Sequence, residues 1–479
     1  MSLITRVSLV GTAALAIAGT AFGAGSENDA LAQIAELKRE LAELKTSNND
    51  SWLTEQRAGE IRGIVQDVLA DADTRTSLQD SGAMAGYNNG FFMSSADGNF
   101  KLEVGALIQV RWVMNDAKEQ NTEWGFENAR TQLNFSGNVV DPSWTYRVRL
   151  SMTPYSTSTV TSNAVGVVDA NGDPAVATAS TAGQATVDFA YVQKTMDNGF
   201  SFRLGQFRAP WMREMLVEDG HQLAVDRSML SAYFGQGFSQ GLGLGYAQEN
   251  WKVDAYYGNG VFNNYSGGAG TNSSWETNST NWSVAGRFEY LIKGNWDQFA
   301  DESSFRGEDF GVMVGVAGLA QRYDNQELLA NLSSGDKTYG VTADVTMDFG
   351  GANMSAAFVW AKNDTDSALG DTNPYGFNVQ GGYFVTDDIE VFGRYDYIDY
   401  KTANGAAKDQ DKYSGVTLGA NWYLAGHNAK LTVDWSLNLK SFGTNDNLAQ
   451  YGWREDVDGA NGDPENNQWA LRAQMQLMF

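Results

Sequence analysis

The sequence contains no cysteine, only two histidines and only six prolines among its 479 residues. Without cysteine, a disulfide framework, a cysteine nucleophile, a cysteine-ligated zinc site and an iron–sulfur cluster are all excluded. After residue 23, no apolar run reaches the roughly 20 residues that a membrane-spanning helix needs. Basic residues are also scarce, 33 against 58 acidic ones, and this argues against a nucleic-acid partner.

Glycine and aromatic residues are abundant instead. The chain has 52 glycines, 14 tryptophans, 24 phenylalanines and 20 tyrosines. So many apolar rings are not typical of a disordered chain. Many glycines and aromatics with few prolines favour an all-β protein with many turns.

The first 23 residues have the layout of a secretory signal peptide. Arg6 is followed by the apolar stretch 7–20, and small residues flank Phe22 before a cleavage point at Ala24. The alternative is a membrane anchor, but the apolar run is shorter than the roughly 20 residues of a spanning helix. We therefore expect an exported protein.

Residues 24–80 are predicted to be helical and periplasmic. Ile34 and Leu41 fit heptad position a, with Ala30, Leu37 and Leu44 at position d. This predicts a short coiled coil that supports self-association. The alternative is a single solvated helix that packs on the rest of the protein. Residues 81–99, rich in glycine, serine and asparagine, are expected to form a linker.

From residue 100 onward, apolar and polar residues alternate with a period of two, which predicts strands with one apolar and one polar face. We predict sixteen such segments, at 100–114, 128–140, 144–153, 186–196, 200–207, 237–247, 251–257, 281–292, 310–321, 338–348, 353–362, 375–385, 388–400, 413–424, 429–440 and 468–479.

The connections between these segments alternate between short and long. Tight turns are expected at one end, apart from a longer link at 293–309, and long connections such as 154–185 and 208–236 at the other. An even number of strands with this alternation is typical of a transmembrane β-barrel, which must close because lipid satisfies no backbone polar group. We therefore predict an all-β, antiparallel barrel in the outer membrane. The first and last strands of the barrel should begin and end, respectively, on the periplasmic side. A soluble β-sandwich or propeller is the alternative, but no repeat of fixed period supports it.

The stretch around residues 200–246 resembles the phosphate-selective porin O and P family of outer-membrane channels. Gly205-Gln206-Phe207-Arg208-Ala209-Pro210 is similar to the family's Gly-Gln-Phe-Lys-x-Pro run, with Arg208 in the place of lysine, and Asp226-Arg227 matches an acidic/basic pair that follows. The resemblance covers most of 90–479. It implies a sixteen-stranded, trimeric porin with phosphate or anion selectivity, and a periplasmic extension such as some members carry.

Two groups of residues are predicted to line the pore. Connection 208–236 is expected to fold into the lumen and form the constriction, although it could instead pack on the rim as an external flap. Its charged residues are Arg208, Arg213, Glu214, Glu218, Asp219, Asp226 and Arg227. The strand alternation also predicts that eight arginines face the lumen: Arg111, Arg130, Arg147, Arg149, Arg203, Arg287, Arg394 and Arg472. These arginines could form a basic strip on the wall, or inward-facing acidic residues could neutralise them.

Together these features predict a porin for passive diffusion of small hydrophilic solutes and ions. Most of the long connections carry more acidic than basic residues, so weak selectivity with a cation preference is expected. The alternatives are an anion- or phosphate-selective porin, and a structural barrel whose periplasmic helices tether the envelope through a cell-wall contact. Outer-membrane lipid and a homotrimer are the expected partners.

No cofactor, metal or catalytic site is expected. The acidic turns that begin at Asp169 and Asp458 could offer oxygen ligands to Ca²⁺, but they lack the EF-hand pattern and are read as solvated turns. Neither histidine lies in a recognisable catalytic motif, so the chain is not expected to be an enzyme.

Overall fold

The computed structural model describes residues 35–40, 83–87, 90–117, 121–168, 174–261, 280–323, 335–364, 371–401, 412–440, 453 and 467–479; for 153–184 it describes the backbone alone. The chain divides into two compact units, Met1–Leu102 and Glu103–Phe479. The predicted signal peptide and most of the predicted coiled coil lie outside the described residues. None of the helices in the described ranges is long and apolar enough to cross a membrane.

The first unit contains two kinds of described structure. Residues 35–40 are helical. Strands β1 (Ala83–Tyr87) and β2 (Phe91–Ser95) pair in antiparallel register within 81–99, the range in which the sequence suggests only a linker. Within this short sheet, the rings of Tyr87 and Phe91 meet edge to face at 5.3 Å. The aromatic residues Tyr87, Phe91 and Phe92 give this segment more strand character than its glycines suggest.

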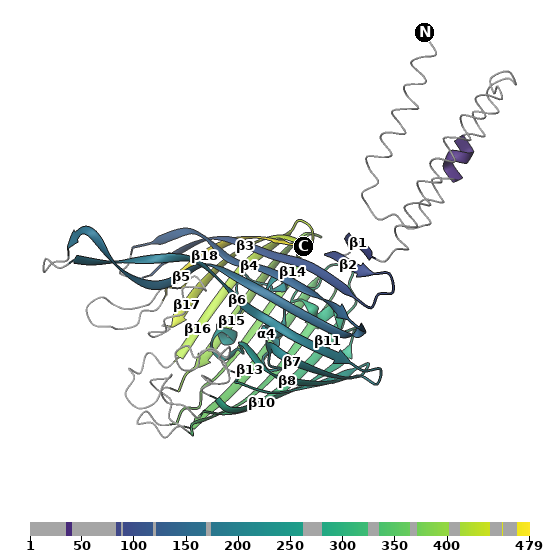
Figure 1. Ribbon diagram of the computed structural model, residues 1–479. Coiled ribbons are helices and arrows are strands. Elements are labelled where there is room, and N and C mark those ends of the chain that lie inside the picture. Colours follow the sequence, from purple (N-terminus) through teal and green to yellow (C-terminus); the bar gives the residue numbers. More distant parts are fainter. Residues whose placement is uncertain are drawn as a thin grey trace, which may run out of the picture. The chain divides into compact units, whose positions relative to one another are not determined.

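Sixteen further strands form one closed antiparallel barrel. Figure 1 shows the tilted strands that make up its wall. Each strand from β3 to β18 pairs with the next along the chain, and β18 returns to pair with β3, so no edge is left unpaired. The strands are β3 Lys101–Asp116, β4 Glu123–Val139, β5 Asp141–Val168, β6 Pro174–Thr195, β7 Phe200–Arg208, β8 Phe238–Ala247, β9 Trp251–Gly258, β10 Thr280–Lys293, β11 Gly311–Tyr323, β12 Lys337–Asp348, β13 Ala352–Asp364, β14 Tyr375–Phe384, β15 Ile389–Asp399, β16 Lys412–Tyr423, β17 Ala429–Lys440 and β18 Trp469–Met478. The predicted strand number and order are confirmed.

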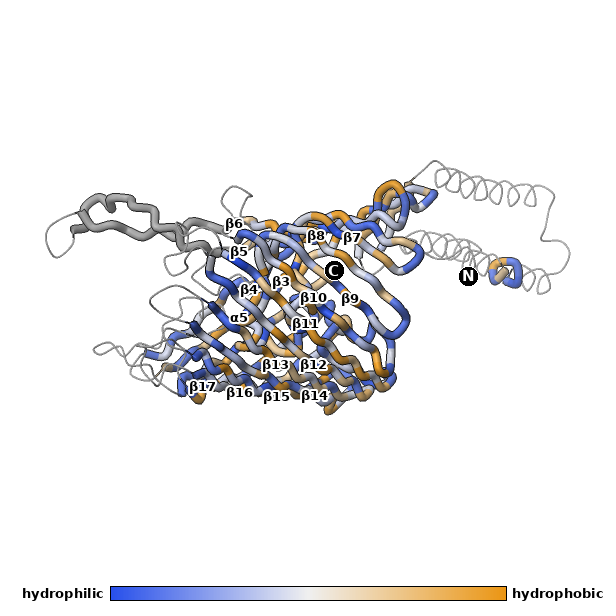
Figure 2. Tube along the Cα trace, turned by 90° about the horizontal axis from the view of Figure 1, so that it is seen from below, coloured by the Kyte–Doolittle hydropathy of each residue, from blue (hydrophilic) through white to orange (hydrophobic). Residues whose placement is uncertain are grey.

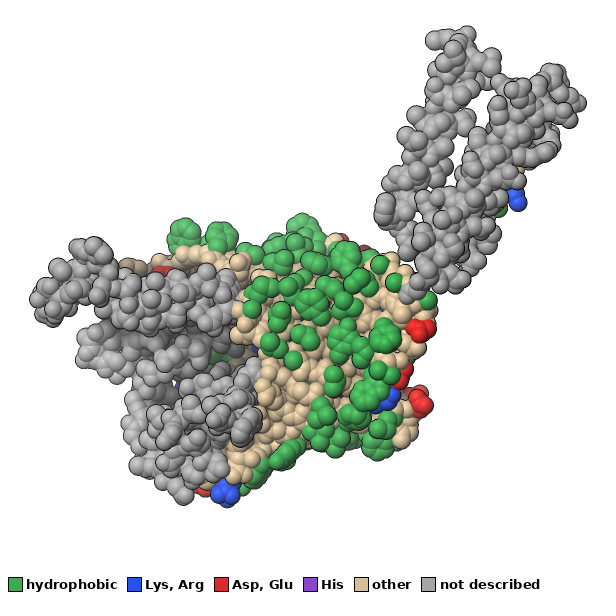
Figure 3. Space-filling view, in the orientation of Figure 1, with side chains coloured by type: hydrophobic (Ala, Val, Ile, Leu, Met, Phe, Trp, Pro, Cys, Tyr) green, Lys and Arg blue, Asp and Glu red, His purple; other side chains and the backbone are tan. Residues whose placement is uncertain are grey.

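The barrel is polar inside and apolar outside. In β17 the buried positions are Lys430, Thr432, Asp434, Ser436 and Asn438, whereas the residues between them are more exposed and mostly apolar. The alternation of hydropathy runs along the strands in Figure 2, and hydrophobic side chains cover the described wall that faces the viewer in Figure 3. An apolar outer band on a closed barrel is the surface that lipid requires.

One predicted connection is wrong. Residues 154–185 are predicted to form a long loop, but β5 and β6 continue through most of this range and pair with each other as far as Val168 and Pro174. The segment is rich in threonine, valine and serine, and its β-branched residues favour an extended strand pair. This range lacks the regular alternation of apolar and polar residues by which the other strands are predicted. Lipid imposes that alternation only on the part of a strand that crosses the membrane, so a strand pair that extends beyond the membrane does not need it.

Candidate functional site

Connection 208–236, between β7 and β8, lies inside the barrel. It forms the short helices α4 (Arg213–Leu216), η1 (Asp219–His221) and α5 (Met229–Phe234). Inward side chains from the last strands hold its backbone: the side chains of Gln476, Lys430 and Asn421 donate to the carbonyl oxygens of Gly220, Gln222 and Leu223 at 2.8, 2.7 and 2.8 Å. The connection is therefore a lumen insert and not an external flap.

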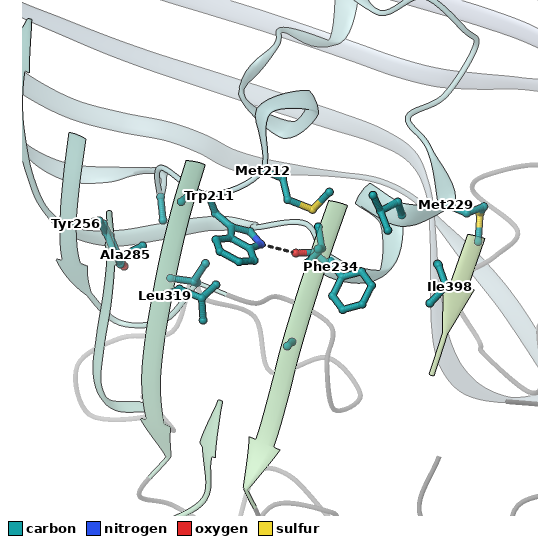
Figure 4. Close-up of a cluster of buried hydrophobic side chains, with 14 of the residues drawn as sticks. Trp211, Met212, Met229, Phe234, Tyr256, Ala285, Leu319 and Ile398 are labelled. Atoms are coloured by element: carbon teal, nitrogen blue, oxygen red, sulfur yellow. Dashed lines mark hydrogen bonds between the residues drawn. The ribbon is translucent and has the colours of Figure 1, made fainter. Parts of the chain in front are cut away.

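An apolar cluster anchors the two ends of this insert to the wall, as Figure 4 shows. Trp211 is fully buried, and its indole Nε1 donates to the carbonyl oxygen of Phe234 at 2.9 Å, which joins the beginning of the insert to the end of α5. Leu319 and Ile398 from the wall belong to the same cluster. The insert thus carries its own small core inside an otherwise polar lumen.

Asp226 is the centre of the largest charge cluster. Its carboxylate, only 2% exposed, accepts from Arg111 at 2.5 Å, from Arg130 at 2.9 Å and from Arg472 at 3.0 Å. Arg394 donates to the Asp226 backbone oxygen at 2.8 Å. Four predicted pore arginines from four strands therefore converge on one residue of the insert.

A second cluster surrounds Glu218 and Asp219. Glu218 pairs with Arg147 at 2.6 Å and with Arg149 at 2.8 Å. Asp219 pairs with Arg227 at 2.5 Å and lies 3.4 Å from the Arg149 guanidinium. The inner wall of β5 is in this way neutralised by acids of the insert.

The remaining charges of the insert are also engaged. Glu214 accepts from the Ser228 backbone nitrogen at 2.7 Å and lies 3.5 Å from Arg394. Arg208 donates to the carbonyl oxygen of Met215, and Arg213 to that of Phe299.

Two inward arginines of the wall pair differently. Arg287 pairs with Asp344 at 2.7 Å and with Glu289 at 2.8 Å, and it donates to the Trp211 carbonyl oxygen at 3.0 Å. Arg203 instead donates to the Gln193 side-chain oxygen at 2.8 Å. Among the eight predicted inward arginines, Arg203 alone has no carboxylate within 4 Å in the described part of the chain.

The surrounding guanidinium groups keep Asp219 and Asp226 of the insert ionised. Burial alone would raise the pKa of Asp219, but attraction to Arg227, Arg149 and Arg208 holds that pKa well below its ordinary value. The pKa of Asp226 is lowered in the same way, with Arg111 the strongest of the attracting charges. Both carboxylates are therefore charged throughout the physiological pH range, and the lumen holds fixed charges of both signs.

A second segment enters the lumen from the opposite end of the barrel. It is the turn 294–310 between β10 and β11, which includes η2 (Asp297–Ala300) and buries Phe299. The Glu302 carboxylate accepts from the Leu223 backbone nitrogen at 2.9 Å, and the Glu302 nitrogen donates to the His221 oxygen at 3.1 Å. This contact is not predictable from the sequence, although the link is unusually long for its end of the barrel.

The only two histidines of the chain meet at this junction. The rings of His221 and His427 lie 4.8 Å apart, and His427 Nε2 lies 3.2 Å from the Asp301 carboxylate. Burial lowers the pKa of His427 to about 4, so the ring is neutral at neutral pH. In the described ranges no group of three or more histidine, aspartate or glutamate residues could hold a metal ion. The site consists of fixed charges and hydrogen-bonding groups around a lumen insert.

Comparison with known proteins gives one family and many related folds. The family model described as phosphate-selective porin O and P matches residues 100–479. Among solved structures, Salmonella typhi OmpF in complex with daunomycin has 15% sequence identity and a TM-score of 0.50, covering 83% of this chain and all (100%) of that one. The anion-selective porin from Comamonas acidovorans has 13% identity and a TM-score of 0.46, covering 79% of this chain and 99% of that one. No curated protein sequence matches.

Proposed function

The chain belongs to the phosphate-selective porin O and P family of outer-membrane channels, and from this premise we propose that it forms a water-filled channel for passive diffusion of small hydrophilic solutes and ions. The proposal rests on the distribution of polar and apolar residues in the barrel. Polar residues are buried in the lumen and apolar residues lie on the outer surface. An apolar outside fixes the barrel in lipid, and a polar inside offers a path for hydrated solutes.

We propose that the insert 208–236 forms the constriction and that the channel is weakly selective, with a preference for cations. The predicted pore residues, apart from Arg203, contact opposite charges or backbone carbonyls, so the lumen arginines present little unbalanced positive charge. The acidic outer connections then attract cations and repel anions over a Debye length of about 8 Å.

Anion or phosphate selectivity is the second candidate. The family description and the unpaired guanidinium of Arg203 favour it. Zero-current potentials in a KCl gradient separate the two candidates: a potential of cation-selective sign supports the first, and one of anion-selective sign supports the second.

We also propose a homotrimer with a helical periplasmic prefix over residues 24–80, following the family resemblance and the heptads of that segment. A tethering role for this prefix is the remaining alternative. A chain that lacks 24–80 but keeps the signal peptide tests this alternative. If the shortened chain still admits solutes in a liposome-swelling assay, the channel is supported. If the shortened chain loses envelope attachment and the intact chain admits no solutes, the tether is supported.

A further inference from the structure

A cavity of about 150 Å³ lies against the inner wall formed by β6 to β9. This is several times the volume of one water, about 30 Å³. Its polar lining comes from Gln193, Ser201, Arg203, Arg208 and Asp254. The cavity lies apart from the Asp226 cluster.

Two unpaired charges of opposite sign face this cavity. Arg203 has no carboxylate partner, and its guanidinium is held in place by Gln193 and by the rings of Tyr191 and Phe207, at 4.6 and 5.1 Å. Asp254 forms no hydrogen bond or ion pair with any described residue, although it lies within the fields of Lys252 and, more weakly, Arg203. Each of the other seven predicted inward arginines has a carboxylate within 4 Å, so this pair of free charges is unusual.

Two glycines of β8 make room between these charges. Arg203 lies opposite Gly243, and Asp254 lies opposite Gly245, which also faces Ser201 on the other side. A Cβ atom at Gly245 would lie 2.6 Å from the Ser201 hydroxyl and 3.0 Å from Asp254 Oδ1. The absence of a side chain there keeps the cavity open.

The two charges reach the cavity from opposite sides. Arg203 lies on β7 and Asp254 on β9, the two strands that flank β8, and their partners on β8 are two residues apart. A small solute with a charged group at each end can bridge such a pair. Arg208 adds a second guanidinium, which is nine-tenths buried. It donates to the Met215 carbonyl oxygen and lies 3.8 Å from Asp219, but its Nε has no hydrogen-bond partner among the described residues.

We propose that this cavity is a binding subsite for zwitterionic solutes of the free amino-acid class. The solute carboxylate lies on Arg203 and Arg208, and the solute ammonium lies on Asp254. A simple anion would leave Asp254 unpaired, and a simple cation would leave Arg203 unpaired, so only a solute with both charges neutralises the site. The inference rests on the proposed channel function, because the lumen must admit the solute.

Four solutes of almost equal size test the proposal: L-alanine carries both charges, lactate only the negative one, alaninamide only the positive one, and lactamide neither. Calorimetric titration of the purified protein measures binding, and reduction of the single-channel KCl current measures occupancy of the pore. We expect saturable binding and current reduction with L-alanine and much weaker effects of the other three.

Matched variants locate the effect. Arg203→Gln and Asp254→Asn should each weaken L-alanine binding by at least about tenfold, the loss of one charged hydrogen bond. Arg306→Gln and Asp387→Asn make the same charge changes in an exposed ion pair outside the cavity and should keep the wild-type affinity for L-alanine.

Three results overturn the subsite: lactate or alaninamide bind as well as L-alanine, the control variants lose affinity equally, or L-alanine fails to bind in calorimetry while KCl current flows. Absence of KCl current from the wild-type protein contradicts the channel function instead. The calorimetric comparison of the four solutes uses the wild-type protein alone. The proposal can therefore be refuted even if a variant fails to fold.

Discussion

Replacement of Asp226 by asparagine should shift the channel toward anions. Asp226 neutralises the guanidinium groups of Arg111, Arg130 and Arg472 in one buried cluster. Asparagine has almost the same shape but removes the negative charge, so three guanidinium groups would be left with one acid fewer to balance them. The positive potential inside the lumen therefore rises.

The size of the shift follows from Coulomb's law. A unit charge about 8 Å from a permeating ion contributes about 0.5 kcal/mol at the dielectric constant of water. A cation loses this attraction and an anion loses the corresponding repulsion, about 1 kcal/mol together. The ratio of K⁺ to Cl⁻ permeability should then fall about fivefold, and more if the local dielectric is lower.

Zero-current potentials in a KCl gradient measure this ratio. Asp387→Asn is the matched control, because its exposed side chain pairs only with Arg306 in the described structure. Breaking a buried ion pair costs about 3–5 kcal/mol, so urea unfolding of each variant accompanies the recordings. Asp226→Glu keeps the charge and should keep the wild-type ratio. An unchanged ratio in Asp226→Asn, or a shift toward K⁺, would refute the electrostatic role of Asp226.

Three other predictions concern the lumen insert, its contact with the turn 294–310, and the prefix. Burial and the neighbouring Glu214 raise the pKa of Glu302 from 4.5 to about 7. The contact of Glu302 with Leu223 should therefore lose stability as the pH rises between these two values. Hydrogen exchange of the Leu223 amide should show this loss in the wild type but not in Glu302→Gln. Trp211→Ala removes the anchor of the insert and should lower the free energy of unfolding in urea by about 3–5 kcal/mol, and a loss below about 1 kcal/mol would contradict the anchoring role. Deletion of residues 24–80 should leave the single-channel conductance unchanged, and a large change would assign the prefix to the pore.

The barrel was predictable from sequence because lipid and water impose a strict two-residue alternation on each strand. Strands such as β17 lie at the predicted residues, 429–440. The extension of β5 and β6 was missed because beyond the membrane that alternation is no longer required. Local propensity alone rarely distinguishes such a strand pair from a loop.

The candidate site was predictable in its residue types but not in its pairing. The alternation assigns Arg111 and Arg472 to the inward face, and the loop length marks 208–236 as special. Which acid meets which arginine depends on how the insert folds across the lumen, and residues 115 positions apart, such as Arg111 and Asp226, leave no local signal. The contact of Glu302 with the insert has the same origin, since two loops from opposite ends meet only in three dimensions.

Single-channel recording of the purified protein in a planar lipid bilayer tests the central proposal most directly. A water-filled barrel with a charged insert in its lumen predicts discrete current steps in KCl that persist at both voltage polarities and shift their ion preference in Asp226→Asn. Folded, membrane-inserted protein that gives no current steps would contradict the channel.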